Sequence, residues 1–177
     1  DPSILLRPHV ILKGPEAAKV TIVEFLDPQC EACRAMHPIT KKVVDEFGSK
    51  VRVAVRYMPF HQNSLYVANV LEGARAQNKF WEALDVLFEK QPEWADHHEP
   101  RLDLIPQILK SVPMNVNQVI TDAKAGKYNS QVEMDQADGK NLGVNATPTF
   151  FINGQKLEEM GYEALREAVA EQVKRAE

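Results

Sequence analysis

Two cysteines, Cys30 and Cys33, are the only cysteines among the 177 residues of the chain. They follow an apolar run, Val20 to Leu26, and a turn that contains Pro28, and they open a segment with helical character. A Cys-x-x-Cys pair between a strand and a helix is typical of a redox centre. The free N–H groups and the positive dipole at a helix start stabilise the first sulfur as a thiolate, which is the form that attacks disulfides. We therefore expect Cys30 to be the nucleophile and Cys33 to resolve the mixed disulfide.

Two other uses of this cysteine pair remain open at this level. The cysteines could form an inert structural disulfide, or they could belong to a zinc site that begins Cys30-x-x-Cys33-x-x-x-His37. A structural zinc site needs four ligands, and the chain's other histidines are at positions 9, 61, 97 and 98. The place of the pair at a strand-to-helix junction favours redox chemistry over both alternatives.

Glu24 is a lone carboxylate in the apolar run, ahead of Cys30. Burial without a partner should raise the pKa of this carboxyl group toward neutrality. Such a group can accept the proton of Cys33 while that thiol attacks a mixed disulfide, which is general base catalysis. The alternative is an acid that reaches solvent at a sheet edge.

The composition indicates an ordinary globular protein. Hydrophobic residues make up 44% and charged residues 26% of the chain, which excludes a disordered chain. The net charge of −4 gives no electrostatic footprint for nucleic acid. No apolar run approaches the ~18 residues of a membrane span, so we expect a soluble mature chain. It begins Asp1-Pro2-Ser3, which suggests either a removed signal peptide or a trimmed front.

The elements that position the cysteines follow from hydrophobic periodicity and turn signals. The apolar run at 19–26 suits a central strand covered on both faces, and the alternation of apolar and polar residues at 51–57 predicts another strand. Because a helix at 30–47 connects these two strands, they should be parallel. Asn153-Gly154 predicts a tight hairpin. We expect strands at 9–13, 19–26, 51–57, 148–152 and 155–157, helices at 30–47, 64–77, 79–89, 101–110, 117–125, 128–141 and 161–174, and a loop at 91–100.

This order predicts an α/β protein with a central mixed sheet flanked by helices and an inserted all-helical subdomain. The expected division is 1–62 and 138–177 for the sheet-containing domain and 63–137 for the insert. From about Val20 to Val173 the chain resembles the DsbA-like branch of the thioredoxin-fold thiol–disulfide oxidoreductases. The resemblance rests on V-E-F-x-D-x-x-C-x-x-C, R-Y-M-P-F-H before an Ala-rich helix, N-K-F-W-E-A-L-D-V-L-F and G-V-N-A-T-P-T-F-F-I-N-G.

The resemblance assigns roles to residues far from the cysteines. It implies that Pro148 follows a cis peptide bond and lies against the cysteine pair, and that substrate peptide adds along the backbone of Thr147. Arg56 falls where related proteins carry a basic residue near the buried acid. It could hold Glu24 ionised, or it could be a solvent-facing charge. The resemblance argues against zinc and implies no metal and no cofactor.

The two residues between the cysteines should tune the redox potential. DsbA has Pro-His there, and its histidine helps to stabilise the thiolate. Here Ala32 is neutral and Glu31 places a negative charge beside the sulfur, so both should raise the pKa of Cys30 relative to DsbA. We expect a potential between the ~−120 mV of DsbA and the ~−270 mV of thioredoxin.

The resemblance implies a monomeric enzyme that passes a Cys30–Cys33 disulfide to unfolded or partly folded cysteine-containing proteins. It implies a periplasmic or otherwise extracytoplasmic location, with an anchor ahead of Asp1 as one option, and a DsbB-like membrane oxidase as partner. The alternative is an isomerase or reductase that a DsbD-like partner keeps reduced. A non-catalytic binding or chaperone module is the third hypothesis. Nucleic acid is not an expected partner.

Overall fold

The computed structural model describes residues 2–177. In this part of the chain, one mixed five-stranded sheet has the order β1-β3-β2-β4-β5. The strands are β1 (Ile11–Lys13), β2 (Val20–Leu26), β3 (Val51–Tyr57), β4 (Thr149–Ile152) and β5 (Gln155–Lys156). β2 and β3 are parallel on either side of α1 (Glu31–Phe47) in the sequence, whereas β1 and β4 run antiparallel to their neighbours β3 and β2. The prediction of a mixed sheet with a parallel βαβ unit is confirmed.

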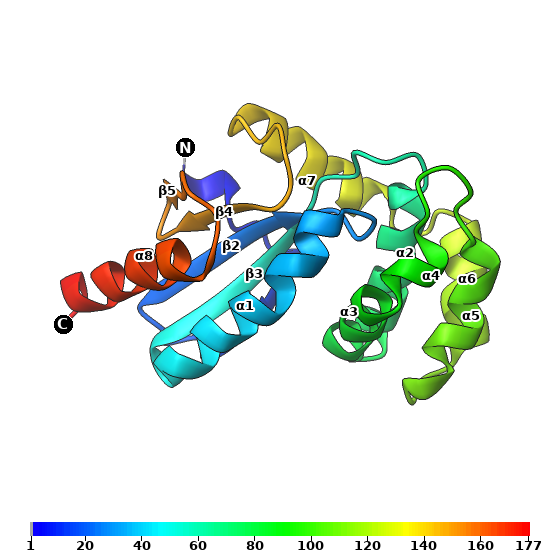
Figure 1. Cartoon of the computed structure of the whole chain (residues 1–177), viewed down its shortest axis with the longest axis horizontal. Helices are drawn as coiled ribbons and strands as arrows, with labels where there is room; N and C mark the ends of the chain where they lie inside the picture. Colours follow the sequence, from blue (N-terminus) through cyan, green and yellow to red (C-terminus); the bar gives the residue numbers. More distant parts are fainter. Residues whose placement is uncertain (1) are drawn as a thin grey trace.

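The two faces of β2 pack into different cores because successive residues of a strand point to opposite faces. Ile22 and Leu26 belong to the larger core, which also contains residues of α1 and of α8 (Tyr162–Arg175). Val23 and Phe25 belong to a smaller core on the other face. Figure 1 shows α1 and α8 on one face of the sheet and α7 (Asn129–Asn141) on the other.

The residues between β3 and β4 form helices. They are α2 (Ser64–Ala76), α3 (Phe80–Glu89), α4 (Gln91–Trp94), α5 (Ile105–Ile108), α6 (Val116–Lys124) and α7. Short 3₁₀ helices occupy Pro2–Ile4, Gly48–Lys50, Leu102–Leu104 and Leu109–Ser111. In Figure 1, α2 to α6 gather beside α1 at one end of the sheet. The expected helical insert is therefore present.

The predicted loop at 91–100 is wrong in its first part. Residues Gln91–Trp94 form α4, and the Trp94 side chain is fully buried with its indole N–H donating to the carbonyl oxygen of Leu87 at 2.8 Å. A helix of four residues is too short to show a 3.6-residue period, so only its apolar anchor could have signalled it. The helix expected at 101–110 is α5 with a 3₁₀ turn at each end.

The end of the insert is continuous with the sheet-containing part. The expected boundary between 137 and 138 falls inside α7, which contacts both β3 and α2. The three-part division thus stays a prediction. After α7 the chain enters β4 through Thr147–Pro148, whose peptide bond is cis. The predicted hairpin is present, with Asn153 and Gly154 at positive φ angles of 47° and 86°. Within residues 2–177, no helix is both long and apolar enough to cross a membrane.

Candidate active site

The two sulfur atoms lie at the start of α1, at the carboxyl end of β2. Cys30 is the N-cap residue of α1 and is half-buried, whereas the side chain of Cys33 is fully buried. The Cys30 Sγ lies 3.4 Å from the carbonyl oxygen of Thr147, which precedes the cis-proline. The backbone N–H of Asp27 donates to the Cys33 Sγ at 3.5 Å. The turn therefore presents one sulfur to solvent and encloses the other.

The surroundings separate the acidities of the two thiols. The pKa of Cys30 is lowered to about 5, chiefly because Cys33 donates a hydrogen bond to it, with help from the Thr147 side chain and the backbone N–H groups of Cys33 and Ala32, while burial opposes the shift. Burial, the bond to Cys30 and the charge of Glu24 all raise the pKa of Cys33 far above the ordinary thiol value. At neutral pH the reduced pair thus carries one thiolate, on Cys30, and one thiol, on Cys33.

Glu24 lies in β2 on the face that α1 covers and is 3% exposed. Burial raises the pKa of this carboxyl group to about 8, as the sequence predicts for an unpaired buried acid. Its effect on the pKa of Cys33 places the two groups within electrostatic reach of each other. The carboxyl group also lines a cavity of about 70 Å³ together with Lys13, Thr40 and Lys41. Glu24 is therefore a neutral acid at pH 7 that can exchange a proton.

Both predictions for Arg56 are wrong. The register of the sheet pairs Phe25 with Arg56 and Glu24 with Val55, so the guanidinium lies on the opposite face from the acid. Arg56 is not solvent-facing, because it is fully buried and bonded to Asp135 and Asp138 of α7 at 2.5 and 2.6 Å. Its charge is thus neutralised by another pair of carboxylates.

The carboxylate of Asp27 joins two turns beside the cysteines. Its side chain is fully buried and does not cap α1, whose N-cap residue Cys30 has no side-chain cap. Instead, the carboxylate accepts hydrogen bonds from the backbone N–H groups of Gln29, Phe60 and His61, the His61 ring and the Ser64 hydroxyl. A buried carboxylate with this many donors joins the β2–α1 turn to the β3–α2 turn. The signal in the sequence is the second acid in V-E-F-L-D, directly before the proline.

The thioredoxin family model matches residues 7–171 of the chain. That range includes the cysteine turn, the buried acid and the cis-proline segment. The chain is a DsbA-like member of the thioredoxin family. Similar solved structures are oxidised BdbD from Bacillus subtilis, with 26% identity, a TM-score of 0.84 and 92% of each chain covered, and α-DsbA1 from Wolbachia pipientis, with 19% identity, a TM-score of 0.87, and 99% of this chain and 96% of that one covered. The second likeness supports the fold alone.

The curated relatives of this DsbA-like chain are much longer than the chain. A Na⁺/H⁺ antiporter NhaA from Herminiimonas arsenicoxydans is 32% identical over 146 residues, which are 82% of this chain and 22% of that protein. An antiporter NhaA 3 from Salinispora tropica is 32% identical over 157 residues, again 22% of its length. The chain thus spans less than a quarter of either relative.

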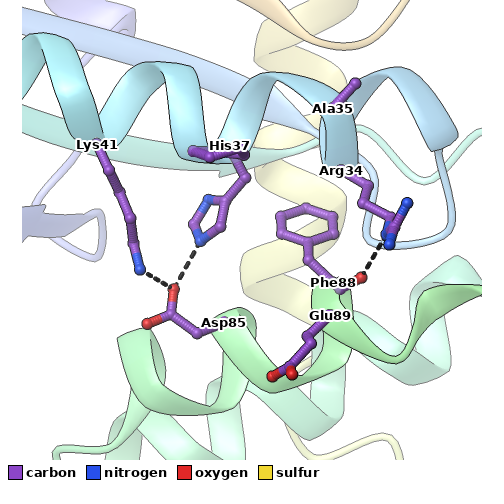
Figure 2. A pocket seen from close by; sticks show the side chains of 8 residues that line it. Arg34, Ala35, His37, Lys41, Asp85, Phe88 and Glu89 are labelled. Carbon is purple, nitrogen blue, oxygen red and sulfur yellow. Dashed lines mark hydrogen bonds and ion pairs between the residues drawn. The ribbon is translucent and has the colours of Figure 1, made fainter.

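The insert of this DsbA-like chain is fastened to α1 by three polar contacts. Figure 2 shows Arg34, His37 and Lys41 of α1 pointing toward α3. The His37 Nε2 and the Lys41 Nζ both lie 2.6 Å from Asp85 Oδ1, and the Arg34 Nε donates to the carbonyl oxygen of Phe88 at 2.8 Å. His37 is thus engaged away from the cysteines. Among residues 2–177, no group of three or more His, Cys, Asp or Glu side chains could hold a metal ion.

The structure brings together most of the residues that the sequence singled out. Cys30, Cys33 and Thr147 are in contact, Pro148 follows Thr147 through the cis bond, and Glu24 acts on Cys33 through its charge. Glu31 and Ala32 are exposed between the cysteines, and their influence on the potential stays a prediction. Arg56 alone is removed from the set. Sequence reasoning missed Gln91, whose side-chain amide reaches the cysteine turn.

Proposed function

We propose that this chain catalyses oxidative disulfide formation in secreted proteins by passing a Cys30–Cys33 disulfide to them. The observation that carries the proposal is the separation of the two thiol acidities. A thiolate with a pKa of about 5 is a good leaving group. A mixed disulfide between Cys30 and a substrate cysteine is therefore resolved in favour of substrate oxidation. An inert structural disulfide has no need for this separation.

The transfer takes two exchange steps. In the first, a substrate thiolate attacks the Sγ of Cys30, the Cys30–Cys33 bond breaks, and the electron pair leaves on Cys33, which takes up a proton. In the second, another substrate thiolate attacks the substrate sulfur of the mixed disulfide. The Cys30 thiolate then leaves, and the substrate keeps the disulfide. Two electrons have moved from the substrate to the cysteine pair, which must be reoxidised before the next cycle.

Glu24 is proposed as the proton partner of Cys33. The Cys33 sulfur cannot remain a thiolate in its buried position, because its pKa is strongly raised. A carboxyl group with a pKa of about 8 can give its proton to the departing Cys33 sulfur, and as a carboxylate it can take the proton back when Cys33 attacks. The 70 Å³ cavity that it lines offers a route for exchange with solvent.

Thr147 and Pro148 are proposed to bind the substrate backbone beside Cys30. The carbonyl oxygen of Thr147 lies 3.4 Å from the Cys30 Sγ, so a peptide whose cysteine reaches Cys30 also reaches the backbone of Thr147. An extended peptide can pair with such a segment by strand addition. This contact is sequence-independent, and it suits an enzyme whose substrates are many different unfolded or partly folded proteins.

The remaining parts of the proposal concern the cellular setting. We place the enzyme as a monomer in the periplasm or another extracytoplasmic compartment, with a DsbB-like membrane oxidase as the group that accepts its electrons. The antiporter activity of the curated relatives is not carried over, because the chain covers only 22% of the first of them. A reductase or isomerase kept reduced by a DsbD-like partner is the second candidate. It is kept because the negative charge of exposed Glu31 next to Cys30 is expected to disfavour a thiolate there.

The test is the reduction potential of the cysteine pair against glutathione, with the pKa of Cys30 measured on the same sample. A potential well above that of the glutathione pool, with a Cys30 pKa below about 6, is the expected result for a disulfide donor. The oxidised protein should also form disulfides in a reduced, unfolded substrate, whereas the Cys30→Ser variant should not. A potential near that of thioredoxin would favour the reductase or isomerase instead.

A further inference from the structure

Three successive carbonyl groups of the cysteine turn face side chains of the insert. The Gln91 Nε2 donates to the carbonyl oxygens of Pro28 and of Cys30, both at 3.0 Å. The ring Nε2 of His97 lies 3.4 Å from the carbonyl oxygen of Gln29, between them. Gln91 is the first residue of α4 and is 3% exposed. The insert therefore holds the backbone of the nucleophile itself.

We infer that Gln91 is a positioning residue for the redox centre: its carboxamide fixes the turn so that the N–H groups at the start of α1 face the Cys30 sulfur. The inference deepens the proposed function and rests on it. On this inference, Gln91 acts through the carbonyl groups of Pro28 and Cys30, to which its side chain donates, and not through contact with the substrate.

The direction of the Pro28 and Cys30 carbonyl dipoles explains why Gln91 should favour the Cys30 thiolate. Their oxygen atoms carry partial negative charge close to a sulfur that must itself become negative. The two N–H groups of one carboxamide place partial positive charge against both oxygens. The Cys30 oxygen also accepts the first helical bond, from the backbone N–H of Arg34 at 3.1 Å. Without Gln91 these buried carbonyl groups would lose a donor, and the turn would have to shift to recover one.

The opposite side of the turn is held independently of Gln91. The backbone N–H of Gln29 donates to Asp27 Oδ1 at 3.0 Å, and Asp27 also binds the His61 ring. The His61 and His97 rings contact each other at a tilt of 42°, with centroids 4.6 Å apart. Asp27 and Gln91 thus bond different backbone groups of the same turn, and of the two only Gln91 belongs to the insert. Removing it should loosen the turn without unfolding the sheet.

The test replaces the side chain of Gln91 and measures the thiolate of Cys30. Gln91→Met keeps the length of the side chain and removes both donors. If a net hydrogen bond is lost only from the thiolate form, the equilibrium constant for Cys30 ionisation falls by roughly threefold to tenfold. Gln91→Glu, which places acceptors against the same carbonyl oxygens, should lower it further. The readout is thiolate absorbance against pH in the reduced protein.

Gln77→Met is the matched control. The Gln77 Nε2 also donates to a backbone carbonyl group, that of Asn115 at 3.1 Å, but this contact lies within the insert. We expect no change in the ionisation of Cys30. Circular dichroism and thermal melts establish whether each variant folds. A second measurement needs no variant: in the wild-type protein, the side-chain amide ¹⁵N resonance of Gln91 should titrate with Cys30, and that of Gln77 should not.

The outcomes separate this inference from the proposed function. If wild-type Cys30 ionises like an ordinary thiol and the protein forms no disulfides in a substrate, the proposed function fails. If the wild type behaves as proposed but the pKa of Cys30 in both Gln91 variants equals that in the wild type, the inference is wrong. It is also wrong if the variants change only the KM for a peptide substrate, because Gln91 would then contact the substrate. The inference is also contradicted if the chemical shift of the Gln91 side-chain amide does not change as Cys30 titrates.

Discussion

The lowered pKa of Cys30 should appear as pH-dependent stability of the reduced protein. The folded-state pKa is about 5 and the ordinary thiol value is 9.0. The pKa is depressed on folding, so this contribution is complete above the unfolded-state value and is lost as the pH falls through the folded-state value. Below pH 5 it is absent. We therefore expect the reduced protein to gain stability steadily between about pH 5 and pH 9.

The size of the gain follows from the distance between pH and pKa. At pH 7 the shift corresponds to two pH units, or about 2.7 kcal/mol at ~1.36 kcal/mol per unit. Cys30 is only half-buried, so solvent screening reduces this figure, and we expect on the order of 1 to 2 kcal/mol. A change of this size shifts a urea midpoint by roughly half a molar to one molar or more in a small protein.

The assay is urea unfolding of the reduced protein at pH 4 and pH 7, in parallel with the Cys30→Ser variant. All other titrating groups are shared, so the difference between the two proteins isolates the thiol. The free energy of unfolding of the wild type minus that of the variant should be larger at pH 7 than at pH 4 by about 1 to 2 kcal/mol. A difference that stays constant between the two pH values would refute the reasoning, because the fold would then not stabilise the thiolate.

Three further variants test the surroundings of the cysteines. Glu24→Gln should raise the free energy of unfolding by up to about 3 kcal/mol at pH 7 and hardly at pH 4, because a pKa raised to about 8 costs stability only above the unfolded-state pKa. The same variant should slow the attack by Cys33 in single-turnover kinetics. Equal rates in variant and wild type would remove Glu24 from the mechanism. Arg56→Met should cost about 3 to 5 kcal/mol in urea unfolding, because two buried carboxylates lose their shared cation, while Arg52→Met on the same strand should cost less than about 1 kcal/mol. Asp27→Asn should lower the free energy of unfolding by about 1 to 3 kcal/mol, since one of the two carboxylate oxygens that accept hydrogen bonds is replaced by a donor. An unchanged urea midpoint would mean that the Asp27 carboxylate does not stabilise the two turns.

The fold and the place of the cysteine turn were predictable because each has a local signal. The run that became β2, the Cys-x-x-Cys pair and the Asn153-Gly154 turn are all written in contiguous residues. The raised pKa of Glu24 could be predicted from its type and place alone, because an acid in a buried strand is desolvated. The cis bond before Pro148 needed the family resemblance, since most X-Pro peptide bonds in folded proteins are trans.

What could not be predicted depends on partners that are distant in the sequence. Arg56 finds its carboxylates 79 and 82 residues away on α7, and Gln91 finds its carbonyl groups 63 and 61 residues away. No period or spacing within a strand or helix specifies such pairs. The sequence also predicts a loop at Gln91, because a four-residue helix carries too little pattern to be recognised.

The place of Arg56 explains why the pKa of Glu24 stays raised. A cation beside Glu24 would hold the carboxyl group ionised and return its pKa toward the ordinary value. Strand parity keeps Arg56 away from Glu24, because Arg56 faces the smaller core, where Asp135 and Asp138 neutralise it. The residue that pairs with Glu24 on β3 is the apolar Val55. One pair of adjacent strands therefore buries a cation paired with two carboxylates on one face and, on the other, an acid whose strand neighbours are apolar. A positive charge introduced at position 55 should lower the pKa of Glu24, and with it the pH at which Cys33 can lose its proton.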